Sequence, residues 1–459
     1  MNIGINPFLP LRAHFRYPSS SNGSADQITS PSNISYSGAS PPELIKLDNG
    51  LRILLQRIPA FNSSGVYVWV DTGSVHESEE LSGISHFIEH IVFKGTKTRS
   101  NLDIVEETEG IGADLNAFTS EENTSFHTLG LGEFSPLLLE VLLDMLTNPK
   151  LDPEDIKKEQ DVVVQEIKMY RDESDHRVLE LASNIMFKGH PYGRSILGTE
   201  ETVRSFTKDK LEQRIKQLYV PQNMIISISG NFDQSGILST IEKIVPAQKV
   251  SSEVFKISPP QYNSDIVIES RKDIEQAHLV FLTKGVSLYD DDRYVAYMIN
   301  TALGGGMSSR LFQEIREKRG LVYTVNSMVD QNKLGGLFGV YLGCEPSKAK
   351  EALEVVIKEL EKLKREGLSP KEFAKARMQL KSHLLLRLES TKALAFSNGR
   401  NQLNYDRSIP IDEINQAVGS ITNDRIIALA NKIFDPKYYT LAVVGKKSKL
   451  PKASSFKLW

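Results

Sequence analysis

The stretch His86-Phe87-Ile88-Glu89-His90 places two histidines and a glutamate within little more than one turn of a predicted helix. Residues four apart on a helix lie one above the other, so His86 and His90 project from the same face with Glu89 beside them. Two imidazoles can bind a zinc ion, and a nearby carboxylate can act as a base for the water bound to that ion. Taken alone, the five residues fit ordinary helix histidines equally well, since the chain contains nine histidines.

A second predicted helix, at residues 154–168, carries two glutamates that share one face. It follows the start signal Asp152-Pro153, and its apolar residues recur at helical spacing. Glu159 and Glu166 are two turns apart. A catalytic zinc site usually takes three protein ligands, so one of these glutamates could complete the site. The alternative for each is a solvated carboxylate, the usual state of a helical glutamate.

The segment from Gly83 to Thr96 resembles the active-site helix of the pitrilysin family of zinc peptidases, whose His-x-x-Glu-His order defines the inverzincins. It is most similar to the branch that contains the mitochondrial processing peptidase beta subunit and its bacterial relatives. In that family a glutamate far beyond the second histidine completes the metal site, and Glu166 has the matching spacing of 76 residues after His90. A further family glutamate, seven residues earlier, corresponds to Glu159.

The resemblance implies one zinc ion per chain, held by His86, His90 and Glu166. It assigns Glu89 as the general base and Glu159 as the residue that orients the ligands. Zinc lowers the pKa of its bound water toward ~7, and Glu89 would accept the water proton and pass it to the leaving amine. Histidine and carboxylate ligands would also accept manganese or cobalt.

The run Leu115-Asn116-Ala117-Phe118-Thr119 resembles the family's edge strand beside the metal. An open strand edge binds extended peptides through main-chain hydrogen bonds, while pockets select among their side chains. The resemblance therefore implies that Asn116, Ala117 and Phe118 hold the substrate. From the residues alone, an ordinary half-buried strand explains the same run.

A triple glycine at residues 304–306 is followed by Arg316 and Tyr323. No Gly-Lys-Ser/Thr follows the glycines, so a phosphate-binding loop is not indicated. The resemblance implies that Arg316 and Tyr323 contact the substrate backbone near the cleaved bond, where they could stabilise a developing oxyanion. Without the resemblance, Arg316 fits a surface charge among neighbouring acids and bases.

The two halves of the chain repeat each other. Residues 218–230 and 433–445 share a turn and a strand at a constant offset, and such long-period similarity marks duplicated domains. Aligning the halves places Val295, Met298 and Ile299 opposite the three polar side chains of the first-half motif. The second half has therefore lost its ligands and is predicted to be non-catalytic.

With 459 residues, the chain is too long for one core and fits two domains of roughly 200 residues. Alternating apolar strands at 65–70 and 277–282 precede long amphipathic helices at 134–146 and 347–365, which predicts an α+β fold. The resemblance implies two homologous α/β sandwich domains, each a mixed sheet with helices packed on one face, and a metal site only in the first. The predicted parts are a disordered or targeting extension at 1–40, a catalytic zinc-binding domain at 41–245, a linker at 246–262 and a non-catalytic homologous domain at 263–459.

Composition restricts the partners and the location. A net charge of −3 argues against nucleic-acid binding, and no apolar run is long enough for a membrane span. The single cysteine, Cys344, cannot form an intrachain disulfide, which fits a reducing compartment. The Ser-, Asn- and Pro-rich residues 1–40 fit a disordered tail or a transit peptide. We predict a bacterial cytoplasmic protein, with the mitochondrial matrix as the alternative.

The predicted activity is zinc-dependent endopeptidase cleavage of extended, unstructured peptides or of precursor and targeting peptides. The resemblance implies a clamshell homodimer, in which Arg316 and Tyr323 of one chain face the metal site of the other. A heterodimer with an inactive homologue is an alternative assembly. A non-catalytic scaffold is the alternative outside enzymes, because the family includes members that keep the fold and lose the ligands.

Overall fold

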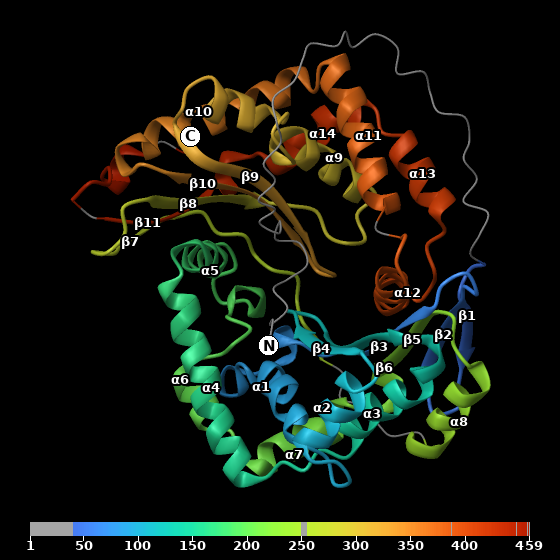
Figure 1. Ribbon diagram of the computed structural model, residues 1–459. Helices are drawn as coiled ribbons and strands as arrows, with labels where there is room; N and C mark the ends of the chain where they lie inside the picture. Colours follow the sequence, from blue (N-terminus) through green and yellow to red (C-terminus); the bar gives the residue numbers. More distant parts are fainter. Residues whose placement is uncertain (1–39, 249–254, 387, 447, 457, 459) are drawn as a thin grey trace.

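Each half of the chain forms one sheet with helices packed against it, and in Figure 1 the sheet of the first half lies in the lower part of the molecule and that of the second half in the upper part. The predicted extension at 1–40 lies outside the described residues except for Ser40, and so does part of the predicted linker at 246–262. The computed structural model describes residues 40–248, 255–386, 388–446, 448–456 and 458.

The first sheet is mixed, as the resemblance implied. Its strands are β1 (Glu43–Lys46), β2 (Arg52–Arg57), β3 (Ser63–Val70), β4 (Asp114–Thr119), β5 (Thr124–Leu131) and β6 (Met224–Gly230). Their order is β1-β2-β6-β3-β5-β4, with β2 and β6 parallel and the other neighbours antiparallel. β4 is the last strand, so among the described strands its outer edge has no neighbour. The run 115–119 therefore lies on an edge strand of the first sheet, as the resemblance implied.

Helices bury one face of this sheet because the strands alternate. In β3, Val66, Val68 and Val70 point into the core beneath the helices, while Tyr67 and Trp69 point to the opposite face. The predicted helix at 134–146 is α3, and the helix at 154–168 lies within α4. The helices of this layer are α1 (Ile84–Ile91), α2 (Asn101–Glu109), α3 (Ser135–Thr147), α4 (Pro153–Asp172), α6 (Glu200–Arg204), α7 (Lys208–Leu218) and α8 (Gln234–Ile244).

The second sheet repeats the first with one strand fewer. Its strands are β7 (Ile266–Ser270), β8 (Ala277–Lys284), β9 (Val322–Gln331), β10 (Gly336–Cys344) and β11 (Thr440–Gly445). Their order is β7-β11-β8-β10-β9. Among the described strands of this second sheet, only β7 and β11 pair in parallel. The position of the parallel pair matches that of β2 and β6, which supports the predicted duplication. The helices on this sheet are α9 (Arg293–Gly304), α10 (Ala349–Glu366), α11 (Pro370–Leu386), α13 (Ile411–Gly419) and α14 (Asn423–Ile433).

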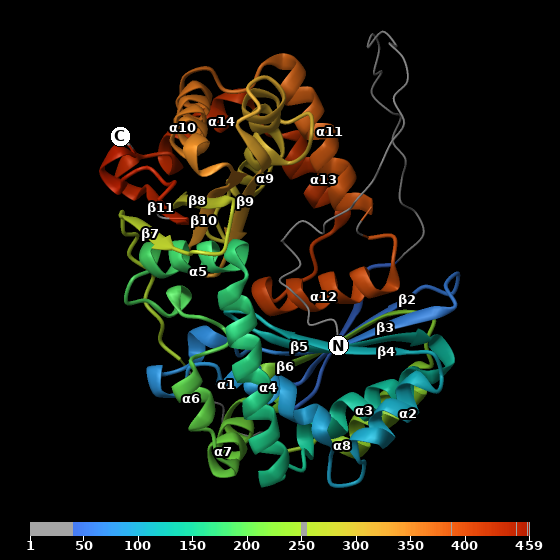
Figure 2. The same ribbon diagram turned by 60° about the vertical axis from the view of Figure 1, so that its left-hand side comes forward.

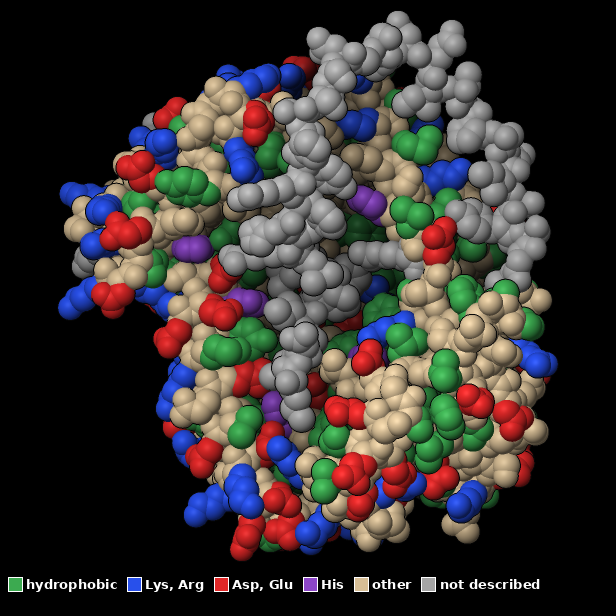
Figure 3. Space-filling model, in the orientation of Figure 1, with side chains coloured by type: hydrophobic (Ala, Val, Ile, Leu, Met, Phe, Trp, Pro, Cys, Tyr) green, Lys and Arg blue, Asp and Glu red, His purple; other side chains and the backbone are tan. Residues whose placement is uncertain are grey.

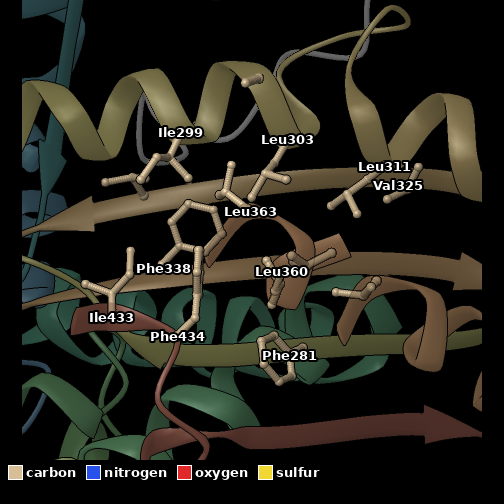
Figure 4. Packing of buried hydrophobic residues seen from close by; sticks show 14 of the residues in the cluster. Phe281, Ile299, Leu303, Leu311, Val325, Phe338, Leu360, Leu363, Ile433 and Phe434 are labelled. Atoms are coloured by element: carbon tan, nitrogen blue, oxygen red, sulfur yellow. The ribbon is translucent and has the colours of Figure 1, made fainter. Parts of the chain in front are cut away.

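Helix α9 occupies the place in the second half that α1 has in the first. Its Ile299 and Leu303 point toward Phe338 of β10 in the apolar core of this half (Figure 4). Val295, Met298 and Ile299, which the alignment placed opposite the motif, are all fully buried. Apolar packing has thus replaced the polar cluster at this position.

The second face of each sheet is covered by a helix from the other half. α5 (Ser174–Met186) follows α4 and packs on β8 and β11, whereas α12 (Thr391–Tyr405) follows α11 and packs on β3 and β6 (Figure 2). The α5 contact is apolar, with Val178, Ala182 and Met186 fully buried. This exchange brings α12 close to the open edge strand of the first half.

The contact beneath α12 contains many polar groups. Asn398 donates to Gln56 and to Ser229, at 2.7 and 3.3 Å. His127 of β5 stacks on Tyr67 with ring centroids 4.6 Å apart, and its Nδ1 has no hydrogen-bond partner among the described residues. Burial, with a smaller contribution from a nearby lysine charge, lowers the pKa of His127 to about 3.

His127→Gln is expected to flatten the pH dependence of stability. Unfolded histidine has a pKa of about 6.5, so between pH 3 and 6.5 the unfolded chain binds a proton that folded His127 does not. Wild-type stability therefore falls as the pH drops below about 6.5, by about 2 kcal/mol at pH 5 from this group. Urea unfolding at pH 5 and 7 measures the difference, with the exposed His383→Gln as the matched control. Equal pH slopes in His127→Gln and wild type would contradict the assignment.

The outer surface shows acidic and basic side chains intermixed on the face in Figure 3. Within the described part of the chain, no helix combines the length and the apolar side chains that crossing a bilayer requires.

Candidate active site

Helix α1 carries polar side chains into the interior. His86 is 4% exposed and Glu89 is 6% exposed. The helix starts after Gly83, and the Glu77 carboxylate accepts hydrogen bonds from the backbone N–H groups of Gly83 and Ser85 at 2.7 and 2.8 Å. A carboxylate at a helix N-terminus satisfies free N–H groups and favours the helix dipole. Glu77, which sequence reasoning did not identify, thus fixes the start of the helix that bears the motif.

The three predicted ligands converge. Glu166 of α4 places Oε2 at 3.8 Å from His86 Nε2 and at 3.4 Å from His90 Nε2. Neither carboxylate oxygen of Glu166 has a hydrogen-bond partner among the described residues, although the side chain is buried. Tetrahedral zinc with bonds of about 2.0–2.2 Å separates its ligand atoms by about 3.4 Å. The spacing and the unsatisfied acceptors therefore fit a divalent cation, and these residues form a group that could hold one.

Glu159 lies behind His90, as the resemblance implied. His90 Nδ1 donates to Glu159 Oε1 at 2.8 Å, which leaves Nε2 facing the cluster, and Lys94 Nζ is 2.7 Å from Glu159 Oε2. Burial opposes protonation of His90, but the bond to Glu159 and the charge of Glu166 raise its pKa to about 9. Charged His90 carries a proton on Nε2 as well as on Nδ1, and a cation bound at Nε2 would displace that Nε2 proton. Lys94 was missed, although it follows His90 at helical spacing.

Glu89 is held by a residue of the edge strand. Thr119 Oγ1 donates to Glu89 Oε2 at 2.5 Å. Burial raises the pKa of Glu89 to about 7, and the bond from Thr119 partly opposes the rise. A general base works best with a pKa near the working pH. Thr119 was also missed. Strand alternation gives the signal, because Thr119 faces the same side as the buried Ala117.

A cavity of about 350 Å³ opens beside these side chains and extends toward the second half. His86, Glu89 and Glu166 line one part of it. The facing wall comes from the second half, at the end of β9 and along α12. The residues of that wall include Asp330, Gln331, Asn332, Phe396, Arg400 and Asn404.

The predicted substrate residues of the edge strand lie on β4. Phe118 lines the cavity. Ala117 is 3% exposed, so a substrate would meet its backbone rather than its side chain. Asn116 Oδ1 accepts a hydrogen bond from the backbone N–H of Ala117 at 2.8 Å. The outer edge of β4 thus has no neighbouring strand among the described residues, although the Ala117 N–H on this strand is bound by the Asn116 side chain.

Arg316 and Tyr323 lie elsewhere on the chain surface. Arg316 belongs to a short π-helix at Phe312–Glu317, where its guanidinium lies 4.8 Å from the centre of the Phe312 ring. Tyr323, at the start of β9, is 58% exposed. Among the described residues that line the cavity, neither side chain occurs. The fold of one chain therefore does not bring these two residues to its own candidate metal-binding group of His86, His90 and Glu166.

The chain matches two family models and several known proteins. The model of the insulinase family (peptidase family M16) matches residues 52–200, and the model of the peptidase M16 inactive domain matches residues 205–380. The uncharacterized zinc protease YmxG of Bacillus subtilis is 36% identical over 403 residues, which cover 88% of this chain and 98% of that protein. An uncharacterized zinc protease of Rickettsia felis is 35% identical over 407 residues, covering 87% and 96%.

Solved structures share the fold. A protease from Helicobacter pylori has a TM-score of 0.82 at 21% sequence identity, over 88% of this chain and 99% of that one. A peptidase M16 inactive domain from Pseudomonas fluorescens has a TM-score of 0.81 at 17% identity, over 89% and 99%. With two matching family models, relatives named zinc proteases and a shared fold, the chain belongs to peptidase family M16, the pitrilysin family of zinc metallopeptidases.

Proposed function

We propose that the protein is a zinc-dependent endopeptidase that hydrolyses extended, unstructured peptides. The observation that carries the proposal is the buried carboxylate of Glu166, which lacks hydrogen-bond partners among the described residues and faces the Nε2 atoms of His86 and His90. A buried carboxylate without a hydrogen-bond partner is costly, and a cation held between it and the two imidazoles would supply the missing partner. Glu89 stands beside the cluster and lines the same cavity.

In this proposal His86, His90 and Glu166 hold the ion. A zinc ion held there would supply Lewis-acid polarisation of a water molecule and would lower its pKa toward ~7. Glu89 takes a proton from the attacking water and delivers it to the nitrogen of the leaving amine. The hydroxyl of Thr119 holds the Glu89 carboxylate in place. Glu159 fixes the ring of His90, as outer carboxylates do for metal-binding histidines.

The substrate class follows from the open edge of β4. A peptide that adds there as a strand must be extended, and it gains main-chain hydrogen bonds whatever its sequence. Unfolded precursor segments and targeting peptides meet this requirement. We therefore propose that the first half, residues 41–245, is catalytic and that the second half, residues 263–459, is a non-catalytic wall. A bacterial cytoplasmic location is proposed from the bacterial relatives, with the mitochondrial matrix as the alternative.

The purified chain is expected to cleave a fluorogenic unstructured peptide in a zinc-dependent manner. A chelator should abolish the cleavage, and one equivalent of zinc should restore it, because one site for a single metal ion is proposed per chain. Zinc content and cleavage are measured on the same sample. Activity that appears only after an inactive homologue is added would favour the heterodimer. A chain that binds no zinc and cleaves nothing would instead be a scaffold.

We also infer that Arg316 and Tyr323 act on the substrate of a partner chain within a homodimer. Both are exposed, and neither lines the cavity of its own chain among the described residues. An exposed arginine and tyrosine can bind a peptide backbone that a second copy presents. The partner arrangement would complete each site from two chains.

Mixing Arg316→Ala chains with Glu89→Gln chains tests this arrangement. In random mixing half of the dimers contain one chain of each kind. One of the two sites in such a dimer combines an intact Glu89 with an intact Arg316 from the other chain, so about one quarter of wild-type activity is expected. Action within one chain predicts no recovery. The control mixes Glu89→Gln with Glu166→Gln chains, whose sites stay defective in every combination.

A further inference from the structure

Helix α4 carries a tyrosine to the cavity one turn beyond the proposed ligand Glu166. Tyr170 follows Glu166 by four residues, so the two side chains project from the same face of the helix. Both line the cavity, together with His86 and Glu89. The candidate metal-binding group therefore has a phenol beside it on α4, whereas the base Glu89 lies on α1 and is held by Thr119 of β4.

The ring of Tyr170 is packed, while its hydroxyl is not bound within the fold. The ring is half-buried and lies edge-on to the His176 ring, with centroids 4.9 Å apart. Among the described residues, none forms a hydrogen bond with the Tyr170 hydroxyl. Tyr192, another tyrosine of the same cavity, donates to Glu122 at 2.6 Å. Because a tyrosine hydroxyl withdrawn from water usually has a partner, that of Tyr170 is left for a molecule in the cavity.

The charges of the site act on this hydroxyl. Burial raises the pKa of Tyr170, and the charges of Glu166, Glu173 and Glu89 raise it further. Charges shift a pKa in this way only when they lie close by, so the hydroxyl is near both a proposed ligand and the proposed base. A phenol already keeps its proton at neutral pH, since its ordinary pKa is about 10. The hydroxyl is therefore a hydrogen-bond donor where the peptidase would work.

We propose that Tyr170 is a catalytic residue, whose hydroxyl donates a hydrogen bond to the carbonyl oxygen of the cleaved peptide bond. The inference rests on the proposed peptidase function. When water adds to the carbonyl carbon, the second bond of C=O breaks and its electron pair moves to the oxygen, while Glu89 takes the water proton. The hydroxyl stabilises the negative oxygen and keeps its own proton. Because that charge develops only during the reaction, the hydrogen bond lowers the barrier rather than strengthening substrate binding.

Tyr170→Phe removes the hydroxyl and keeps the ring that packs on His176. Its kcat for an unstructured peptide should fall by about 10²-fold, with KM within a few-fold of wild type and zinc affinity unchanged. Tyr192→Phe is the matched control, because it lines the same cavity but its hydroxyl is bound to Glu122. Its kcat should stay within a few-fold of wild type.

Two results of this experiment would overturn the proposal. If zinc-loaded wild type cleaves the peptide and Tyr170→Phe has the same kcat, the hydroxyl is not a donor in the reaction, and the peptidase proposal stands. If Tyr170→Phe instead binds zinc about tenfold or more weakly, the hydroxyl supports the ligand Glu166 and does not act on the substrate.

A tetrahedral analogue tests the same contact without hydrolysis. In a phosphinic peptide, an anionic phosphinate replaces the cleaved bond. Calorimetry on zinc-loaded protein should show at least about tenfold weaker binding of this analogue to Tyr170→Phe than to wild type. The corresponding peptide should bind equally to Glu89→Gln chains with and without Tyr170→Phe. Equal losses for both ligands would overturn the proposal. If wild type cleaves nothing but only the phosphinate is lost, the contact with the anionic oxygen stands and the peptidase proposal is wrong.

Mixing Tyr170→Phe chains with Glu89→Gln chains shows which chain the hydroxyl serves. If Tyr170 acts within its own chain, every site in every dimer lacks one of the two groups. The mixture should then be no more active than its Tyr170→Phe chains alone, in contrast to the recovery expected with Arg316→Ala. Recovery to about one quarter of wild-type activity would place the hydroxyl at the partner's site and overturn the assignment.

Discussion

Glu89→Gln is expected to lower kcat for peptide cleavage by about 10²- to 10⁴-fold while the chain keeps its zinc. The substitution preserves size and shape, and the amide oxygen can still accept the hydrogen bond that Thr119 donates to Glu89. An amide cannot take up a proton at neutral pH, so the loss should affect the chemical step rather than the fold. Steady-state kinetics give kcat, and atomic absorption gives the zinc content of the same preparation.

Glu121→Gln is the matched control for this prediction. Glu121 is another carboxylate that lines the cavity. It is half-buried, and desolvation, followed by repulsion from Asp330, raises its pKa to about 7. Among the described residues, Glu121 makes no contact with the proposed ligands. Loss of its carboxylate should therefore change kcat only a few-fold. If Glu89→Gln retained kcat within a few-fold of wild type with zinc bound, Glu89 would not be the base.

The positions of the three polar residues of α1 could be predicted because the pattern that indicates them lies within one helix. His86, Glu89 and His90 share a helix, and their spacing alone places them on one face. Glu166 could be matched to them only by the resemblance, since helical periodicity says which face of α4 is buried and not what it meets. The contacts at 3.4 and 3.8 Å between Glu166 and the two histidines are a property of tertiary packing.

The supporting residues could not be predicted with the same ease. Thr119 and Lys94 have local signals, in strand alternation and in helical spacing, but both patterns also occur at ordinary structural positions. Phe396 has no local signal, because its place in the cavity wall depends on α12 crossing onto the first sheet from the other half of the chain. Amphipathic patterns show that a helix buries one face. They do not show which sheet it covers, so the exchange of α5 and α12 required coordinates.

Glu166→Gln is expected to abolish stoichiometric zinc binding, and with it both activity and zinc-dependent stabilisation. The carboxylate is the only anionic ligand of the proposed group, and a neutral amide is a poorer ligand for a divalent cation. Wild type at a free zinc concentration of about 1,000 times Kd should gain about 4 kcal/mol in unfolding free energy, since the ion binds the folded chain. The variant should gain nothing under the same conditions. Isothermal titration calorimetry and thermal unfolding with and without zinc measure the two effects.

Glu159→Gln tests the residue that orients His90, whereas Glu166→Gln tests a proposed ligand. Glu159 holds His90 through Nδ1 at 2.8 Å but is not one of the three converging ligand groups. Its loss should weaken zinc binding by about 10- to 100-fold while one zinc still binds per chain. The two glutamates lie two turns apart on α4, so any general damage to that helix should affect both variants alike. Tight stoichiometric zinc binding by Glu166→Gln would show that the third ligand lies elsewhere, and the proposed metal centre would then be wrong.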